Sequence, residues 1–264
     1  MGHTGEVHGF RPDSYGDSFA DIYDEWYQDV SDAEGTVAFL LDLAKGRPVH
    51  ELGIGTGRIA LPLAAAGVAV SGIDASEPMV ALLRAKAGGE SVKVVIGDMA
   101  EVGTLAPPPG ARFGVMFVAF NTFFNLTSRE AQQRCLDGVA SRLAPDGRFV
   151  LEAFVPADHT YDVDDWSGPV GVRSIEYDRV VLSVSRRDIG SQILTGQYVE
   201  LSEAGGVRLR PWVIRYAAPA ELDAMAADAG LELVSRHSGW RGEPFTASSP
   251  HHVSVYRSAG APGE

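Results

Sequence analysis

The chain of 264 residues has a single cysteine, Cys135, and no long hydrophobic run. One cysteine excludes a disulfide bond within the chain and fits a protein of a reducing compartment. No segment approaches the roughly 18–20 consecutive apolar residues that a membrane span requires. The N-terminus also lacks the apolar core of a signal peptide. We therefore expect a cytoplasmic protein that has no membrane partner.

Basic residues are scarce as well. The sequence has 22 Lys and Arg against 35 Asp and Glu, which gives a formal net charge of −13. Proteins that bind nucleic acids neutralise the phosphates with a basic face. The basic residues of this chain are scattered instead, and Arg186-Arg187 is their longest run. This pattern predicts that nucleic acid is not a partner and that the substrate is small and neutral or weakly cationic.

Two common catalytic signatures are missing. The histidines do not show the H-x-x-x-H or Cys/His spacing of metal sites, so we expect no metal cofactor. The G-x-S-x-G sequence of many serine hydrolases is absent too, which argues against that class.

A glycine-rich turn is the most informative feature that is present. Residues 49–60 read V-H-E-L-G-I-G-T-G-R-I-A, a short apolar strand that ends at Glu51 and continues into Gly53, Gly55 and Gly57. Glycines spaced in this way let the backbone bend tightly and approach a ligand closely. A helix is predicted directly after the turn, and its first N–H groups attract negative ligand atoms. The segment predicts a nucleotide-type ligand at a strand–turn–helix junction.

Two classes of ligand fit this turn. Residues 55–60 satisfy the dinucleotide pattern G-x-G-x-x-A, and Asp74 follows at the distance expected for a ribose-binding acid. The longer run 51–57 resembles the first motif of class I S-adenosylmethionine (SAM) methyltransferases. A carboxylate at Glu51 would repel a pyrophosphate but would favour the ammonium and sulfonium groups of SAM. The turn therefore favours SAM and leaves an NAD(P)-dependent oxidoreductase as the alternative.

Further strand ends support the SAM interpretation. Strands are predicted over 68–74 and 92–99. Residues 113–124 are predicted as a strand that runs into an aromatic loop, and residues 143–152 as a helix end, a Pro-Asp-Gly turn and a fifth strand. The last of them contains L-x-P-x-G-x-x-x-x-E, which resembles the approach to strand five in the class I methyltransferases. Residues 47–155 carry this resemblance. They predict an α/β protein with the doubly wound, Rossmann-like sheet of that family.

The resemblance implies a set of site residues. Asp74 would accept hydrogen bonds from the ribose hydroxyls, Asp98 would accept one from the adenine amino group, and Met99 would pack on the adenine ring. The implied cofactor-binding residues are Tyr15, Tyr23, Glu51, Gly53, Gly55, Gly57, Asp74, Ala75, Met79, Gly97, Asp98, Met99 and Phe120. The implied catalytic residues are Tyr15, Tyr23 and Phe123.

An aromatic and acidic segment precedes the first strand. Residues 15–27 read Y-G-D-S-F-A-D-I-Y-D-E-W-Y, with aromatic residues at helical spacing. The pattern Y-x-x-x-F-A-x-x-Y-D resembles the N-terminal lid of small-molecule N-methyltransferases, whose tyrosines face the sulfonium and the substrate. We expect a helix in which Tyr15 and Tyr23 lie about two turns apart. The alternative is a helix whose aromatic residues only pack on the core.

The chain after the fifth strand departs from the bare fold. Residues 156–216 contain four β-rich runs and no convincing helix, which predicts an antiparallel insertion. This insertion resembles the substrate-covering sheet of the aminosugar N-methyltransferases. We divide the chain into lid helices (1–46), a SAM-binding core (47–155), the β insertion (156–216), and a last helix with an antiparallel strand pair (217–264).

Together, the tyrosine lid, the N-T-F-F sequence at 121–124 and the insertion most resemble the N-methyltransferases of lincosamide biosynthesis. That resemblance implies methylation of the proline-ring nitrogen of an N-demethyl-lincosamide of the celesticetin or lincomycin type. SAM would be the cofactor, S-adenosylhomocysteine (SAH) the product, and a small-molecule amine the acceptor. Phe123 would lie beside the reacting methyl group or simply pack at the strand end. A nucleotide-linked aminosugar as acceptor, an idle SAM-binding module and a homo-oligomeric assembly stay open.

Overall fold

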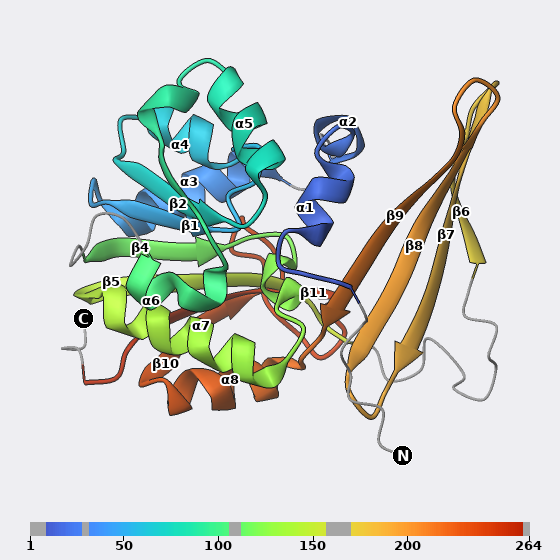
Figure 1. Cartoon of the computed structure of the whole chain (residues 1–264). Helices are drawn as coiled ribbons and strands as arrows, with labels where there is room; N and C mark the ends of the chain where they lie inside the picture. Colours follow the sequence, from blue (N-terminus) through green and yellow to red (C-terminus); the bar gives the residue numbers. More distant parts are fainter. Residues whose placement is uncertain (1–8, 28–31, 106–111, 157–169, 261–264) are drawn as a thin grey trace.

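The computed structural model describes residues 9–27, 32–105, 112–156 and 170–260. It has a seven-stranded sheet with helices on both faces and a separate four-stranded sheet that projects from this body (Figure 1). Helices α1 (Ser14–Phe19) and α2 (Tyr23–Tyr27) lie between the two sheets. Helix α1 contacts both the projecting sheet and the main body.

The large sheet has the strand order β10-β11-β5-β4-β1-β2-β3. Its strands are β1 (Val49–Leu52), β2 (Val70–Asp74), β3 (Lys93–Ile96), β4 (Phe113–Val118), β5 (Leu143–Phe154), β10 (Leu231–His237) and β11 (His251–Ser258). Strands β1 to β5 pair in parallel, and β11 runs antiparallel to both β5 and β10. This arrangement confirms the predicted doubly wound sheet with its final antiparallel pair. The strand order reverses between β1 and β4, where sheets of this type form a crevice at their carboxyl ends.

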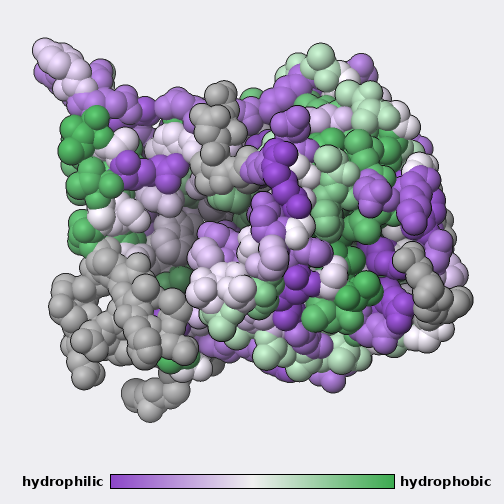
Figure 2. Space-filling model, turned by 180° about the vertical axis from the view of Figure 1, so that it is seen from behind, coloured by the Kyte–Doolittle hydropathy of each residue, from purple (hydrophilic) through white to green (hydrophobic). Residues whose placement is uncertain are grey.

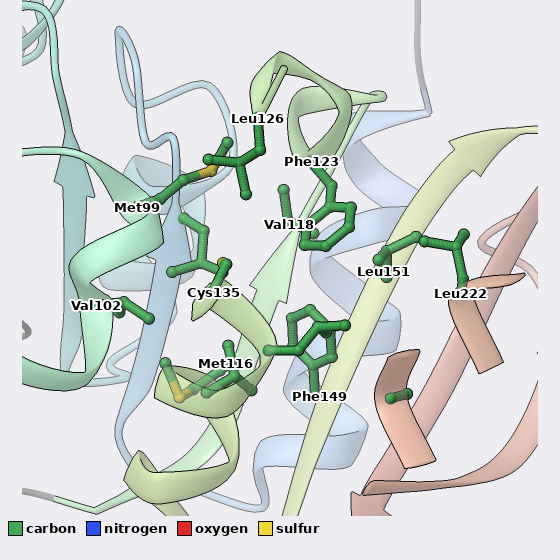
Figure 3. Packing of buried hydrophobic residues seen from close by; sticks show 14 of the residues in the cluster. Met99, Val102, Met116, Val118, Phe123, Leu126, Cys135, Phe149, Leu151 and Leu222 are labelled. Carbon is green, nitrogen blue, oxygen red and sulfur yellow. The ribbon is translucent and has the colours of Figure 1, made fainter. Parts of the chain in front are cut away.

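Helices cover both faces of this sheet because its central strands are apolar on both sides. In β4, Met116 and Val118 join one core cluster, whereas Val115 and Phe117 join the other. Figure 3 shows the first cluster, in which Cys135 packs among residues of β4 and β5. The covering helices are α3 (Ala33–Ala44), α4 (Ala60–Ala65), α5 (Glu77–Ala85), α6 (Val102–Leu105), α7 (Arg129–Arg142) and α8 (Pro219–Asp228). Within the described ranges, no helix is both long and apolar enough to cross a membrane.

The lid is not the single continuous helix that the sequence predicts. It is broken between α1 and α2, and the N–H of Ile22 donates to the carbonyl of Phe19 in a tighter turn. The carbonyl of Ser18, which a continuous α-helix would pair with Ile22, instead accepts a 2.7 Å hydrogen bond from Arg210 of the small sheet. A tertiary contact thus takes the acceptor that the helix would have used.

The small sheet is the predicted antiparallel insertion. Its strands follow chain order and are β6 (Val170–Ile175), β7 (Arg179–Asp188), β8 (Ile193–Ser202) and β9 (Gly206–Arg215). Arg215 at the end of β9 anchors it to the body, because its guanidinium donates to Gln132 of α7 and to Glu221 of α8, each at 2.6 Å. The division of the chain into four domains stays a prediction.

Gly138 of α7 allows a close approach to α6. A Cβ at this position would lie 2.7 Å from the backbone nitrogen of Gly103 and 2.8 Å from a Val102 methyl carbon. We expect Gly138→Ala to lower the free energy of unfolding by roughly 1–3 kcal/mol because of this overlap. The loss should occur although Ala favours helices more than Gly does. Chemical denaturation measures the change.

Gly171→Ala in β6 is the matched control, since no atom lies within 4 Å of its Cβ position. Its free energy of unfolding should stay within about 0.5 kcal/mol of the wild-type value. A Gly138→Ala protein as stable as the wild type would show that α6 and α7 can move apart at no cost.

Candidate active site

A cleft of about 620 Å³ lies at the carboxyl ends of β1, β2 and β3, beneath the lid. It is lined by Pro12, Tyr15, Gly16, Tyr23, Gly53, Gly55, Ile73, Asp74, Ala75, Met79, Gly97, Asp98, Met99, Thr122, Asn125 and Leu126. Ten of the predicted site residues are in this set. Glu51 and Phe120 line an adjoining cavity of about 320 Å³, which shares Tyr23, Gly53, Gly55 and Thr122 with the cleft. The two spaces share these lining residues, and together they make up the candidate site.

The glycine-rich turn has the left-handed backbone that its sequence predicts. Gly53, Gly55 and Gly57 have φ values of +67°, +53° and +81°, a region that other residues adopt only with strain. A Cβ at Gly53 would lie 2.3 Å from a methyl carbon of Thr122 across the cleft. Gly57 is not among the lining residues, and a Cβ there would lie 2.9 Å from the Cγ of Leu83. The structure thus gives Gly57 a packing contact with α5, and its predicted contact with the cofactor stays a prediction.

Asp74, at the end of β2, is held by the backbone on either side of it. One carboxylate oxygen accepts from the N–H of Gly55 at 2.7 Å and the other accepts from the N–H of Ser76 at 2.9 Å. Burial raises the pKa of this carboxyl, and these two hydrogen bonds oppose the shift. Each oxygen keeps a second lone pair, so a carboxylate fixed in this way can still accept hydrogen bonds from neighbouring ligand hydroxyls.

Glu51, at the end of β1, is a buried acid below the glycine turn, 5% exposed. Burial raises the pKa of its carboxyl well above the ordinary value, and the nearby Arg58 guanidinium opposes that shift. A cationic ligand group would stabilise the ionised carboxylate, whereas a pyrophosphate would be repelled by it. The site therefore suits the ammonium of a methionyl group better than a dinucleotide.

The residues that directly follow β3 form another part of the cleft wall. The Asp98 carboxylate accepts from the N–H of Ala100 at 2.9 Å and begins a short 3₁₀ helix, Met99–Glu101. Met99 contacts both the cleft and the core, where it is 8% exposed. One apolar and one acidic side chain thus border a space in which a planar heterocycle with an amino group could bind.

The lid is fastened over the cleft by side-chain contacts. Asp24 of α2 accepts from the Thr56 hydroxyl of the glycine turn at 2.6 Å and pairs with Lys86 at 2.6 Å. Asp17 of α1 accepts from the Ser76 hydroxyl at 2.8 Å. The lid residues Asp17 and Asp24 were not predicted as site residues, although their acidic character beside the tyrosines is visible in the sequence.

Both predicted lid tyrosines reach the cleft despite the break in the helix. Tyr15 donates to the Tyr27 hydroxyl at 3.2 Å and stacks on Phe19 with ring centres 4.5 Å apart. Burial raises the pKa of Tyr15 well above its ordinary value, and the neighbouring Tyr27 adds to the shift. Burial also raises the pKa of Tyr23, and the positive charge of Arg58 partly opposes this shift. Both phenols are therefore neutral near pH 7 and offer hydroxyl groups rather than phenolate bases.

The aromatic turn after β4 places its phenylalanines differently. Phe120 borders the cavity near Glu51, and the Arg58 guanidinium lies 5.6 Å from the centre of its ring. Phe123 is fully buried and packs in the core beside Val118 (Figure 3). It is not a lining residue of either space. A role for Phe123 beside the reacting carbon therefore stays a prediction.

This turn is strained, and the predicted strand-five motif holds it. Phe120 and Asn121 have φ values of +53° and +63°, which cost energy in residues with a side chain. Glu152, the final acid of L-x-P-x-G-x-x-x-x-E, accepts from the N–H of Phe120 at 2.6 Å. The Asn121 side chain accepts from the N–H of Phe154 at 2.7 Å. The sequence pattern thus has a local physical role, to fix the wall of the site.

Arg58 is the main site residue that sequence reasoning did not identify. It lines the cavity beside Glu51 and also a second, more open space with Tyr23, Asp24, Tyr27 and Lys86. Its position directly after Gly57 was a usable signal, because a cation there can bind a carboxylate at the turn. Within the described ranges, no group of three or more His, Cys, Asp or Glu residues could hold a metal ion.

Comparisons with known proteins agree with this geometry. The methyltransferase domain family matches residues 49–147. The cypemycin N-terminal methyltransferase of Streptomyces sp. is 32% identical over 250 residues, which cover 90% of this chain and 95% of that protein. The structure of the CcbJ methyltransferase from Streptomyces caelestis is 42% identical, covers 95% of this chain and 100% of that chain, and has a TM-score of 0.85.

A more distant structure shares the fold alone. DesVI of Streptomyces venezuelae is 21% identical, with coverage of 91% of this chain and 98% of that chain and a TM-score of 0.66. The extended identity to the first two proteins, together with the sheet order and the acidic cleft, establishes the family. The chain therefore belongs to the class I, S-adenosylmethionine-dependent methyltransferases.

Proposed function

We propose that this protein is an N-methyltransferase of natural-product biosynthesis that acts on a secondary amine of a small molecule. The acceptor that we favour is the proline-ring nitrogen of an N-demethyl-lincosamide. The observation that carries the proposal is the meeting of two neutral lid tyrosines, Tyr15 and Tyr23, with the acidic cleft. The name of the cypemycin relative indicates methylation at a peptide N-terminus, which is also an amine. The reaction would take place in the cytoplasm, in accord with a single, buried cysteine.

The cleft residues fit the parts of SAM. Asp74 would accept from the ribose hydroxyls, Asp98 and Met99 would hold the adenine, and Glu51 would pair with the methionyl ammonium. Arg58 lies where it could bind the methionyl carboxylate. When bound, SAM supplies an electrophilic methyl carbon: the bond from sulfur breaks as the bond to the amine nitrogen forms, and SAH leaves. The protein therefore has to orient the amine in line with that carbon and exclude water.

The lid provides both functions. The rings of Tyr15 and Tyr23 cover the cleft, and aromatic faces attract cations by about 0.5–2 kcal/mol. Their hydroxyls can bond to the acceptor nitrogen and fix its lone pair toward the methyl carbon. The acceptor ammonium must first lose its proton, and burial below the lid favours the neutral amine.

Three arginines beside the lid are already paired with acidic residues of the protein, which makes them poor ligands for the diphosphate of a nucleotide-linked sugar. Arg208 pairs with Asp21 at 2.7 Å, and Arg179 pairs with Glu25 at 2.9 Å. Arg210 is buried and pairs with Asp21 as well. These guanidiniums are neutralised within the protein, so none of the three is free to bind a diphosphate.

The proposal is tested by incubating the protein with SAM labelled in its methyl group and with an N-demethyl-lincosamide. We expect the label on the proline-ring nitrogen, located by fragmentation in a mass spectrometer. A nucleotide-linked aminosugar and a peptide with a free N-terminus serve as competing acceptors. Faster labelling of the sugar would overturn the preferred acceptor, and SAH binding without turnover of any amine would favour an idle SAM-binding module.

Asp74→Asn should weaken SAH binding. The change removes a charge that strengthens the hydrogen bonds to the ribose, and it turns an amide N–H₂ toward one of the two backbone donors that hold the carboxylate. The expected loss is roughly 1.5–3 kcal/mol, or about 10- to 150-fold in Kd. Calorimetry measures it, with the exposed Asp137→Asn as the matched control. An unchanged Kd in the Asp74 variant would remove the ribose assignment.

Tyr15→Phe and Tyr23→Phe should each impair catalysis while the fold persists. Both changes keep the ring and remove only the hydroxyl that would orient the amine. We expect kcat/KM to fall by about 10- to 100-fold, which corresponds to roughly 1.4–2.8 kcal/mol. Tyr177→Phe is the control, because that side chain is fully exposed in the turn between β6 and β7. Wild-type kinetics combined with lower thermal stability would support the alternative in which the lid tyrosines only pack on the core.

A further inference from the structure

A guanidinium lies among three aromatic rings where the lid meets the small sheet. The Cζ atom of Arg173 in β6 is 4.4 Å from the ring centre of Trp26. The ring centres of Tyr198 and Tyr27 lie 5.1 Å and 5.5 Å from the same atom. Trp26 and Tyr27 belong to α2, and Tyr198 belongs to β8. Aromatic faces grouped around one point attract cations and are a means of binding ammonium ligands, so we call these three rings the aromatic cage.

Arg173 reaches the cage because β6 is irregular at this point. The pairing of β6 with β7 shifts between Val172 and Ser174, which leaves Arg173 as an extra residue. Such a bulge bends the strand and redirects a side chain. Arg173 also donates to the carbonyl of Trp26 at 3.3 Å, but the residue is exposed and belongs to the edge strand of its sheet. Its side chain can therefore leave the cage without disturbing a core.

The cage itself is held by other contacts. The rings of Trp26 and Tyr198 both pack on Phe19, with ring centres 6.2 Å and 5.8 Å away. The Tyr27 ring is buried and packs on Tyr23 with ring centres 4.7 Å apart. The three rings would thus keep their places after the guanidinium had moved away.

A second guanidinium lies near the cage but is fixed. The Cζ atom of Arg210 is 5.5 Å from the ring centre of Trp26. Its side chain is buried and pairs with Asp21 and Glu200, which neutralise its charge locally. A ligand cation in the cage would therefore meet a compensated charge on that side.

The aromatic cage adjoins the candidate active site through Tyr27. The Tyr27 hydroxyl accepts from the Tyr15 hydroxyl at 3.2 Å, and Tyr15 lines the cleft. Figure 2 shows that the small sheet stands beside the body with a recess between them, so a small molecule can approach the junction of sheet and body from that side. A ligand group in the cage would lie one side chain away from the cleft.

We propose that the aromatic cage is a subsite for the ammonium form of the acceptor, and that Arg173 occupies its place until the acceptor binds. An alkylamine is mostly protonated in neutral water, and a chain with a net charge of −13 attracts cations. The cage would bind this charged form before the nitrogen reaches the cleft, where the neutral amine reacts. The inference rests on the proposed function for the class of acceptor, but cation binding at the cage is measurable without any acceptor.

The probe is choline, and 3,3-dimethylbutan-1-ol is its neutral isostere. Binding of each to the full chain, with and without SAH, is followed by saturation-transfer NMR of its methyl signal over a range of concentrations. We expect choline to bind about 10-fold more tightly than the alcohol or better, because the two differ in charge and hardly in shape. In the methyl-transfer assay, choline should compete with the acceptor amine and not with SAM. Equal affinities for choline and the alcohol would overturn the inference.

Variants of the cage and of its present occupant locate the site. Tyr198→Leu should weaken choline binding by about 2- to 30-fold because it removes one ring of three, and Tyr198→Phe should recover most of the affinity. Arg173→Ala removes the competing cation, so choline should bind about 3-fold more tightly or better.

Arg186→Ala is the matched control, since it removes the same charge from an exposed position of β7. Arg186 is three residues from Ser183, the cross-strand partner of Tyr198, and therefore projects from the opposite face of the sheet. This variant should bind choline as the wild type does.

The outcomes separate this inference from the proposed function. Choline binding that Tyr198→Leu leaves unchanged and Arg173→Ala does not strengthen would overturn the cage, even in a protein that methylates the lincosamide. A protein that binds choline as expected but does not methylate the lincosamide would support the cage and refute the preferred acceptor. Circular dichroism of each variant should match the wild type. If Tyr198→Leu does not fold, Arg173→Ala decides, because its side chain is exposed.

Discussion

The lid is held over the cleft by three aspartates, each of which binds a different part of the protein. Asp17 accepts from Ser76 at the start of α5, Asp21 pairs with Arg210 of the small sheet, and Asp24 pairs with Lys86 beyond the glycine turn. Because the lid contributes Tyr15 and Tyr23 to the cleft, the geometry of the site depends on these polar contacts. An ion pair at the surface contributes little to stability, but a set that joins three separate segments determines where the lid lies.

Arg210 is the most demanding member of this set. Its side chain is only 1% exposed and donates to Asp21, to Glu200 and to the carbonyl of Ser18. A buried guanidinium is costly unless its donors are satisfied, and here the lid supplies most of the acceptors. The lid and the small sheet are thereby coupled: removal of the lid would leave Glu200 as the remaining one of these three acceptors for the guanidinium. This coupling explains why an insertion far from the glycine turn in the sequence belongs to the same functional unit.

The cleft contains buried acidic residues whose charge would match that of a cationic cofactor. Burial raises the pKa of the Glu51 carboxyl, and burial also raises that of Asp74 against the opposing backbone hydrogen bonds. In the protein alone, these groups therefore bind protons more readily than in water. The positive charges of SAM would favour their ionised forms, so the site is adapted to a ligand that brings its own positive charge.

The sequence by itself determined the fold and the end of the sheet at which the candidate site lies. Strand-end residues such as Glu51, Asp74 and Asp98 are local features, because each lies at or just beyond the end of a segment that is predicted as a strand. Only the tertiary structure decided which long-range contacts shape the lid and the walls of the site. Where the lid helix is broken, the Ser18 carbonyl binds Arg210 of the small sheet, and core packing takes Phe123 into the interior. Such outcomes depend on contacts between residues that are distant in the chain, about which local periodicity carries no information.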